Sequence, residues 1–430
     1  MDMFDLAQTM PEQWNCDQFV KIFIMRAKVR FQLSLMMFLE FFIWGAWYSA
    51  IAVYMSSNGM KSLTHWPFTV NAVAAIIAPF FVGLIADRYF ATQKVLGTLH
   101  ILGALFMFIT PSLTDNPLLF ILSLLAYNIC YMPTMSLANT LAFHQMTQQE
   151  KQFPSIRVFG TIGWIAAGLT ISFILVGFVQ QDMKPEATAL PLYLTAGSSL
   201  LLGLYSFSLP HTPPPAAGKK VRARTIIGID AFKKLGSRSF YVFLASSLLI
   251  CIPLAVYYNY TQLFLENSQF ENIAATQTIG QASEMIFMLL MPLFFRRLGV
   301  KWMLAVGMLA WVLRYALFAA AAPETTTWMI MAGIALHGIC YDFFFVTGQI
   351  YMDKKASLEI RAQAQGLMIF ITYGVGMLIG TQIAGELYNS FLGEGVSLSL
   401  MQWQQFWWIP AAFAGGVLLF FVAAFNEKIK

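Results

Sequence analysis

Long apolar runs follow one another along almost the whole chain, separated by short polar stretches. A helix that crosses a lipid bilayer needs about 20 apolar residues. Runs of about this length predict twelve spanning helices, at residues 33–55, 67–86, 95–112, 117–143, 156–178, 189–209, 240–265, 276–295, 301–322, 326–352, 364–386 and 405–425. The pattern therefore predicts an all-α, polytopic membrane protein.

The basic residues give these spans an orientation. If both termini are cytoplasmic, 22 of the 26 Lys and Arg residues fall in inside segments. Lys61 and Lys184 fall in outside loops, and Arg157 and Arg314 lie within spans. Cytoplasmic loops of membrane proteins carry an excess of Lys and Arg. The distribution therefore predicts that both termini are on the cytoplasmic side.

The composition excludes several other classes of protein. The chain is 58% hydrophobic and 11% charged, whereas soluble domains are about 25% charged. Its net charge is +5, with the basic residues in loops rather than on one face, so no nucleic-acid surface is expected. The four cysteines are scattered without a CxxC motif, so no disulfide framework and no metal or other cofactor is expected. Residues 1–24 lack the features of a signal peptide and are interpreted as an appended or mis-assigned N-terminus.

A basic segment at residues 211–239 divides the spans into six and six. The tripeptide ICY occurs at 129–131 and again at 339–341, an offset of 210 residues. Such a repeat is typical of transporters built from two parallel six-helix units. We predict a cytoplasmic segment at 1–32, pseudo-symmetric halves at 33–210 and 240–430, and a linker between them. The linker could form an amphipathic surface helix, but an ordinary basic loop is the preferred interpretation.

Polar side chains recur at helical spacing within five of the spans. A helix places residues i, i+3, i+4 and i+7 on one face. By this rule or by adjacency, the groups are Arg157, Thr161 and Trp164; Gln277, Gln281 and Glu284; Glu40, Trp44, Trp47 and Tyr48; His337, Tyr341 and Phe344; and Tyr258, Asn259 and Gln262. These groups cannot face lipid and must line a cavity or pair inside the bundle. Carboxylates, amides and aromatics together fit a polar ligand that has an aromatic face and hydroxyl groups.

The simpler alternative is that some of these charges only tie helices together, for instance Arg157 with Glu40 or Glu284. Arg314 has no polar residue on the same face of its helix, so a structural role is expected for it. His100 is expected to have hydrogen-bond partners.

Asp342 lies near the middle of the tenth span, next to Tyr341. An ionised carboxylate there costs about 2.5–3.5 kcal/mol, and burial favours its protonated form. We therefore predict that Asp342 couples protons to transport, together with Glu284 and Glu40.

The segment GLIADRYF, at residues 83–90, follows the second span. Gly83 permits a close helix approach, and Asp87 and Arg88 lie where the chain leaves the membrane. We predict a gating latch here. A solvated pair of loop charges is the alternative.

The twelve spans, the basic central loop and the GxxxDR pattern resemble the major facilitator superfamily, although Arg296 replaces the acidic residue in the second half. More specifically, the segments FIWGAWYS, YMPTMSLANT, FPSIRVFGTIGW, WVLRYALF and YDFFFVTGQIYMDKKASLEIRAQAQG resemble the bacterial nucleoside:proton symporter family. The resemblance implies the major facilitator fold and proton-driven nucleoside uptake across the inner membrane. The nucleoside-binding positions that it implies are Arg157, Thr161, Gln281, Glu284, Tyr341 and Asp342.

The chain departs from this family at several positions. Trp164 stands where Phe is common, Tyr258 and Asn259 replace a Gln/Asn pair, and Glu40 stands in place of Gln. Trp164, Tyr258, Asn259 and His337 are still predicted to bind substrate. The preferred base and the proton stoichiometry stay open.

Two rival functions were weighed. One is transport of another small polar solute, such as a sugar, on the same fold. The other is a membrane enzyme that uses His337 and Asp342 as an acid–base pair. Their i, i+5 spacing separates them by about 140° around a helix, and the loops are short, so no enzyme is expected. A monomer in the bilayer, with a nucleoside and a proton as its ligands, is the prediction.

Overall fold

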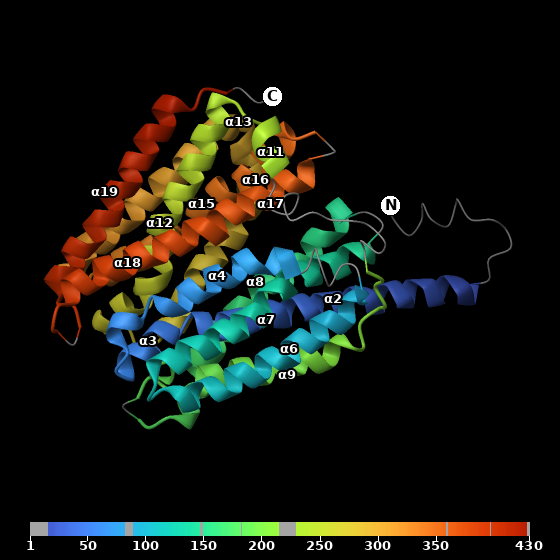
Figure 1. Ribbon diagram of the computed structural model, residues 1–430, viewed down its shortest axis with the longest axis horizontal. Helices are drawn as coiled ribbons and strands as arrows, with labels where there is room; N and C mark the ends of the chain where they lie inside the picture. Colours follow the sequence, from blue (N-terminus) through green and yellow to red (C-terminus); the bar gives the residue numbers. More distant parts are fainter. Residues whose placement is uncertain are drawn as a thin grey trace.

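The computed structural model describes residues 16–81, 89–146, 149–181, 183–214, 229–357, 360–395 and 397–427. Every regular element in these ranges is helical (Figure 1). The prediction of an all-α protein is therefore confirmed for the described chain. The predicted latch of Gly83, Asp87 and Arg88 lies outside the described residues.

The first half of the chain supplies the blue to green helices of Figure 1. They are α2 (Cys16–Tyr48), α3 (Ile51–Ser57), α4 (Trp66–Phe81), α6 (Thr92–Ile109), α7 (Pro117–His144), α8 (Gln149–Leu169) and α9 (Leu190–Ser206). Helix α8 continues through a π-helical turn, η4 (Thr170–Ile174), and a 3-10 turn, η5 (Leu175–Phe178).

The second half supplies the yellow to red helices. They are α11 (Ile229–Lys234), α12 (Arg238–Asn267), α13 (Ile273–Ala321), α14 (Thr327–Ala335), α15 (His337–Tyr341), α16 (Thr347–Lys355), α17 (Arg361–Ile369), α18 (Met377–Leu392) and α19 (Leu400–Ala424). Two π-helical segments interrupt this series, η8 (Asp342–Val346) and η9 (Phe370–Gly376). Helix α11, in the predicted linker, packs against α17.

The predicted number of spans agrees with the helices. Nine stretches of the described chain are long and apolar enough to cross a membrane. One of them, Ile273–Glu324, changes direction at Gly299, whose φ of 65° favours glycine, and so holds two spans. Helices α4 and α9, with 16 and 17 residues, complete the twelve.

The helices of each half pack against one another as a bundle. In the first half α2 packs against α8 and α9, and α6 packs against α7 and α9. In the second half α12 packs against α18 and α19, and α13 packs against α15 and α19. The two halves meet along α8 with α13 and along α4 with α18 (Figure 1).

Hydrogen bonds join the halves at one end of the bundle, which we call the outer end. It carries Lys61 and Lys184, the two loop residues predicted to face outside, and lies near α3 at the left of Figure 1. The side chain of Gln262 donates to the carbonyl of Tyr48 at 2.7 Å, and its oxygen accepts from the Ala52 amide at 3.2 Å.

The first turn of α13 is capped at the outer end by the opposite half. Glu186 Oε1 accepts from the Ala274 amide at 3.0 Å, and Ser172 Oγ accepts from the Ala275 amide at 3.0 Å. Lys184 Nζ donates to the carbonyl of Phe270 at 2.8 Å. The first amides of a helix have no partner within the helix, and a carboxylate there also interacts favourably with the helix dipole. These contacts therefore hold the outer ends of the two halves together.

Replacement of Glu186 with Ala should loosen this outer-end closure. Loss of a hydrogen bond to a charged group costs about 1.5–3 kcal/mol, so the population open at this end should rise about tenfold. Labelling of a Ser49→Cys variant by a membrane-impermeant maleimide would measure the change, because Ser49 is buried at the outer end. Glu186→Gln, which keeps an acceptor, should change labelling less. Equal labelling in all three backgrounds would show that Glu186 does not hold the halves together.

Replacement of Gly163 with Ala should destabilise the first half. A Cβ atom on Gly163 would lie 2.1 Å from the carbonyl oxygen of Phe38, where α2 and α8 are in contact. Separating two packed helices costs about 1–3 kcal/mol, so the melting temperature in detergent should fall by several degrees. Gly416→Ala is the matched control, because nothing lies within 4 Å of its added Cβ. A Gly163→Ala protein as stable as this control would contradict the packing described here.

Candidate functional site

The candidate site lies where α2 and α8 of the first half face the second half. The ring of Trp164, on α8, is 5.3 Å from that of Trp44 and 5.8 Å from that of Tyr48, both on α2. Tyr48 in turn is 5.4 Å from Tyr258 on α12, with the rings edge to face. Three aromatic side chains from the first half thus meet one from the second. Aromatic contacts therefore cross the boundary between the halves.

The aromatic contacts continue into the second half. The ring of His337, on α15, lies 6.1 Å from Tyr258 and 5.8 Å from Tyr341. Tyr257 stacks on His337 at 5.4 Å. The hydroxyl of Tyr341 is hydrogen-bonded to that of Tyr373, in the π-helical segment η9. The predicted residues Trp164, Tyr258, His337 and Tyr341 therefore belong to one connected cluster.

Arg157 and Glu284 bring opposite charges to this cluster from the two halves. The guanidinium carbon of Arg157 lies 4.0 Å from the centre of the Phe41 ring, a cation–π contact. A Cβ atom on Gly160 would come within 2.7 Å of Arg157 Nη1, so glycine makes room for the guanidinium. Glu284, on α13, lies close to Arg157 and to Tyr341. The structure therefore brings together a cation, a carboxylate and the aromatic cluster.

Asp342 is fully buried and begins the π-helical segment η8. Neither of its carboxylate oxygens has a hydrogen-bond partner among the described residues. Glu284 is the charged neighbour with which Asp342 interacts. A buried carboxyl group without a partner is tolerated best in its neutral form. π-Helical turns inside α-helices occur frequently at functional sites.

Two of the other predicted ligands, Thr161 and Asn259, are buried. Thr161 is 8% exposed and Asn259 is fully buried. The side-chain oxygen and nitrogen of Asn259, and Oε1 of Gln281, have no hydrogen-bond partner in the described part of the chain. Gln277 instead donates to the carbonyl of Ser49 at 3.1 Å, at the outer end. Substrate binding by Thr161, Asn259 and Gln281 stays a prediction.

Glu40 does not pair with Arg157, the alternative considered from the sequence. Its Oε2 is 2.9 Å from Nε2 of His100, inside the first half. Both side chains are buried, and Ser199 Oγ lies 3.2 Å from His100 Nδ1. His100 therefore has partners on both ring nitrogens, as expected. A proton-coupling role for Glu40 stays a prediction.

Arg314 is buried between aromatic rings of the second half. Its guanidinium carbon is 4.0 Å from the ring of Tyr257 and 4.8 Å from that of Trp311. Its Nε donates to the carbonyl of Gly333 at 2.9 Å. Tyr257 and Gly333 belong to other helices, so the spacing within α13 could not show these two contacts, whereas Trp311 lies three residues before Arg314 on the same helix. The arrangement supports the structural role expected for Arg314.

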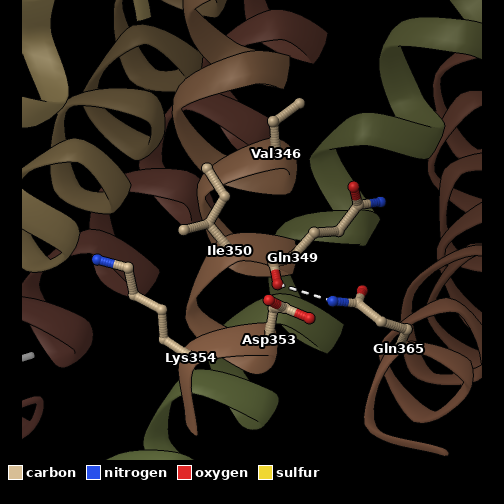
Figure 2. A pocket seen from close by; sticks show the side chains of 6 residues that line it. All are labelled: Val346, Gln349, Ile350, Asp353, Lys354 and Gln365. Atoms are coloured by element: carbon tan, nitrogen blue, oxygen red, sulfur yellow. Dashed lines mark hydrogen bonds between the residues drawn. The ribbon is translucent and has the colours of Figure 1, made fainter. Parts of the chain in front are cut away.

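A groove of about 320 Å³ opens beside α16 (Figure 2), and α16 lies at the end of the bundle away from α3 (Figure 1). It is lined by Val346, Gln349, Ile350, Asp353, Lys354 and Gln365. Gln365, on α17, donates to the carbonyl of Gln349 at 2.8 Å. Asp342 does not line the groove, but Val346, which does, follows Asp342 by four residues, about one helical turn.

Tyr373 is a residue of the cluster that the sequence did not point to. It lies in the segment FITYGVG, where neither a charge nor a helical stripe distinguishes it from a lipid-facing aromatic residue. Only its hydroxyl contact with Tyr341 places it at the site. The two glycines that follow it, Gly374 and Gly376, were the one available sign of close packing.

Comparison with known proteins agrees with this arrangement. A sequence model of the family described as Nucleoside H+ symporter matches residues 27–430. The YegT protein of Escherichia coli is 39% identical over 406 residues, which cover 93% of this chain and 95% of YegT. The xanthosine permease of Escherichia coli is 28% identical over 424 residues, covering 94% of this chain and 98% of the permease.

The nucleoside permease NupG of Escherichia coli is similar in both sequence and structure. It is 29% identical over 421 residues, covering 93% of this chain and 96% of NupG. A crystal structure of NupG matches with a TM-score of 0.80, covering 93% of this chain and all of that one. The fold predicted from the spans is thereby confirmed. With a family match across nearly its whole length, the chain belongs to the nucleoside H+ symporter family, as its sequence motifs predicted.

Proposed function

We propose that this protein carries nucleosides into the cell together with protons, by alternating access around the central cluster. The observation that carries the proposal is the aromatic contact across the halves, from Trp164 through Tyr48 to Tyr258. Rocking of residues 33–210 against residues 240–430 would open and close this junction. In transporters of this architecture the substrate site lies at the interface of the repeats, near the middle of the membrane.

The chemistry of the cluster fits a nucleoside. Aromatic side chains such as Trp164, Tyr258 and His337 can pack against a planar base. Glu284 and Gln281 can accept and donate hydrogen bonds to ribose hydroxyls. Arg157 offers a planar fork of donors for base or ribose oxygens. The relatives named for nucleosides and for xanthosine support this substrate class.

Asp342 is the proposed proton carrier. Its buried carboxyl group has no partner in the described residues, so a proton is the simplest means of neutralising it. When the end of the bundle opposite the outer end opens, the groove lined by Gln349 and Asp353 would continue the proton path from Asp342 to the cytoplasm. Glu284 lies near enough to Asp342 for the charge of one carboxyl group to affect the other. Loss of the proton from Asp342 would therefore change the electrostatic environment of Glu284, which is proposed to hold the ribose.

The contacts at the outer end indicate which end of the bundle is closed in this conformation. Glu186, Lys184 and Gln262 all bond across the halves there. With the outer end predicted to face the periplasm, we assign an inward-facing conformation. We also propose a bacterial inner-membrane location with both termini cytoplasmic, and a monomer as the transporting unit.

Uptake by purified protein in proteoliposomes tests the proposed function. Labelled purine and pyrimidine nucleosides should accumulate only with an inward proton gradient, and the accumulated label should be unchanged nucleoside. A panel of sugars serves as the control for the same fold. Sugar accumulation without nucleoside accumulation would assign the protein to the rival transport function. Chemically altered label would instead indicate an enzyme.

Arg157→Lys should reduce nucleoside uptake by at least tenfold. Lys keeps the charge but lacks the planar fork, and its ammonium does not match the guanidinium contact with Phe41. Initial rates of uptake at several nucleoside concentrations would measure the loss. Arg238→Lys, at an exposed site at the start of α12, is the matched control. Uptake at the normal rate by Arg157→Lys would leave Arg157 with a structural role.

Asp342→Asn should abolish uphill accumulation while nucleoside binding and counterflow exchange persist. Asn has nearly the same shape but cannot take up or release a proton. The ratio of internal to external nucleoside under an inward proton gradient would measure the effect. Asp115→Asn, on an exposed loop, controls for the loss of a carboxylate elsewhere. Accumulation by Asp342→Asn equal to that of the wild type would remove Asp342 from the proton path.

A further inference from the structure

The buried pair of Glu40 and His100 joins four helices of the first half. Glu40 is on α2, His100 on α6, Thr134 on α7 and Ser199 on α9. Thr134 Oγ1 lies 2.5 Å from Glu40 Oε1, and Glu40 Oε2 lies 2.9 Å from His100 Nε2. The exposed fractions of Glu40 and His100 are 0% and 1%, so bulk water does not reach either group in this conformation.

The hydrogen bonds determine how many protons the pair holds. Ser199 Oγ donates its only hydrogen to the carbonyl of His100 at 3.0 Å. Toward His100 Nδ1 this oxygen can therefore only accept, so Nδ1 must carry a hydrogen. The 2.9 Å contact between Nε2 and Glu40 then contains one proton, on the ring or on the carboxyl group. With Thr134 Oγ1 donating to Glu40 Oε1, and not to the Tyr131 carbonyl that lies at the same distance of 2.5 Å, the pair is neutral overall in both cases, which removes most of the cost of burying it.

The pair lies directly behind the first-half wall of the nucleoside site. The hydroxyl of Tyr131 donates to the Glu40 carbonyl at 2.6 Å, and its ring is 6.0 Å from His100. The same ring is 6.2 Å from Trp44, which contacts Trp164. On α2, Phe41 directly follows Glu40 and lies beneath Arg157. A shift of α2 at Glu40 would therefore move two side chains of the site.

We propose that Glu40 and His100 are positioning residues, which hold one shared proton and fix α2 so that Phe41 and Trp44 face the nucleoside. The other titratable or charged groups around them are Tyr127 and Tyr131 on α7, and Arg157 acts on Tyr131 from α8. The shared proton stays on the pair throughout the transport cycle. This gives Glu40 a role different from the proton carrier expected from its sequence. The inference rests on the proposed nucleoside site.

Two substitutions of Glu40 separate positioning from proton transfer. In Glu40→Gln the amide can donate to His100 Nε2 and accept from Thr134, so each hydrogen bond of the carboxyl group has a replacement. We expect nucleoside affinity within about threefold of the wild type, with the same pH profile and the same proton-to-nucleoside ratio. Glu40→Leu leaves His100 Nε2 without a partner, and leaves Thr134 with the Tyr131 carbonyl alone. Unpaired buried groups cost about 1–3 kcal/mol, so KM should rise about tenfold while kcat changes less.

The measurements are nucleoside binding, followed by quenching of tryptophan fluorescence, and proton-coupled uptake in proteoliposomes. Thr110→Val is the matched control. It removes a buried hydrogen bond to Ser123 in the same half, 2.9 Å long, at a place away from the site. It should lower the melting temperature as Glu40→Leu does but leave KM unchanged. If Glu40→Leu does not fold, Thr134→Val supplies the same comparison with a smaller rise in KM.

Two results would overturn the proposal. A Glu40→Gln protein that loses uphill accumulation, or changes its proton ratio, would show that Glu40 carries a transported proton. A folded Glu40→Leu protein with wild-type KM would show that the pair only stabilises the bundle. Failure of the wild type to bind any nucleoside is a different outcome, because it would refute the proposed function before any variant is compared.

Discussion

The desolvation of charge within the bilayer is the constraint on which this structure depends. An ionised side chain inside the bundle has no water to solvate it, so its partners must come from another helix. Glu40 finds His100 across α2 and α6, and Arg157 finds the ring of Phe41 across α8 and α2. Arg314 is held by the ring of Tyr257 across α13 and α12. Each buried charge therefore defines a junction between helices, and the junctions together fix the bundle.

The two halves meet this constraint at equivalent positions with different chemistry. Trp47 contacts Tyr127 at 5.9 Å in the first half, and Tyr257 contacts His337 at 5.4 Å in the second. Both members of the second pair follow the first by 210 residues, the offset of the repeated ICY tripeptide. Beside the first contact lies the neutral Glu40–His100 pair, and beside the second lies the cation of Arg314. The repeat thus supplies one backbone arrangement, and the two halves place different charged groups beside it.

Much of the architecture could be predicted from the sequence, because spans are long apolar runs and need no knowledge of contacts. The helical stripes also identified Trp164, Tyr258, His337 and Tyr341, which the structure joins into one cluster. The spacing of residues along one helix shows only which of them share a face of that helix, however. They could not show that Glu40 faces α6 rather than the boundary of the halves.

Other features depend on geometry that a helical wheel does not contain. Tyr373 is recognised by a hydroxyl contact between two helices, and Glu186 by its reach from a loop to the first turn of α13. The π-helical segment at Asp342 shifts the register of all residues that follow it, so an ideal α-helical spacing misplaces Gln349 relative to Asp342. These features were therefore accessible only from the folded chain.

The distribution of partners accounts for the proposed role of Asp342 in proton coupling. Glu40 is hydrogen-bonded to His100, and Glu284 lies near the cation of Arg157. Asp342 alone among these carboxyl groups has neither a hydrogen-bond partner in the described residues nor a cation beside it. Its protonation therefore changes the net charge of the centre, whereas the other groups stay balanced. A neutral nucleoside adds no charge to the centre, so on the proposed mechanism the proton on Asp342 would set the electrostatic cost of moving the loaded centre.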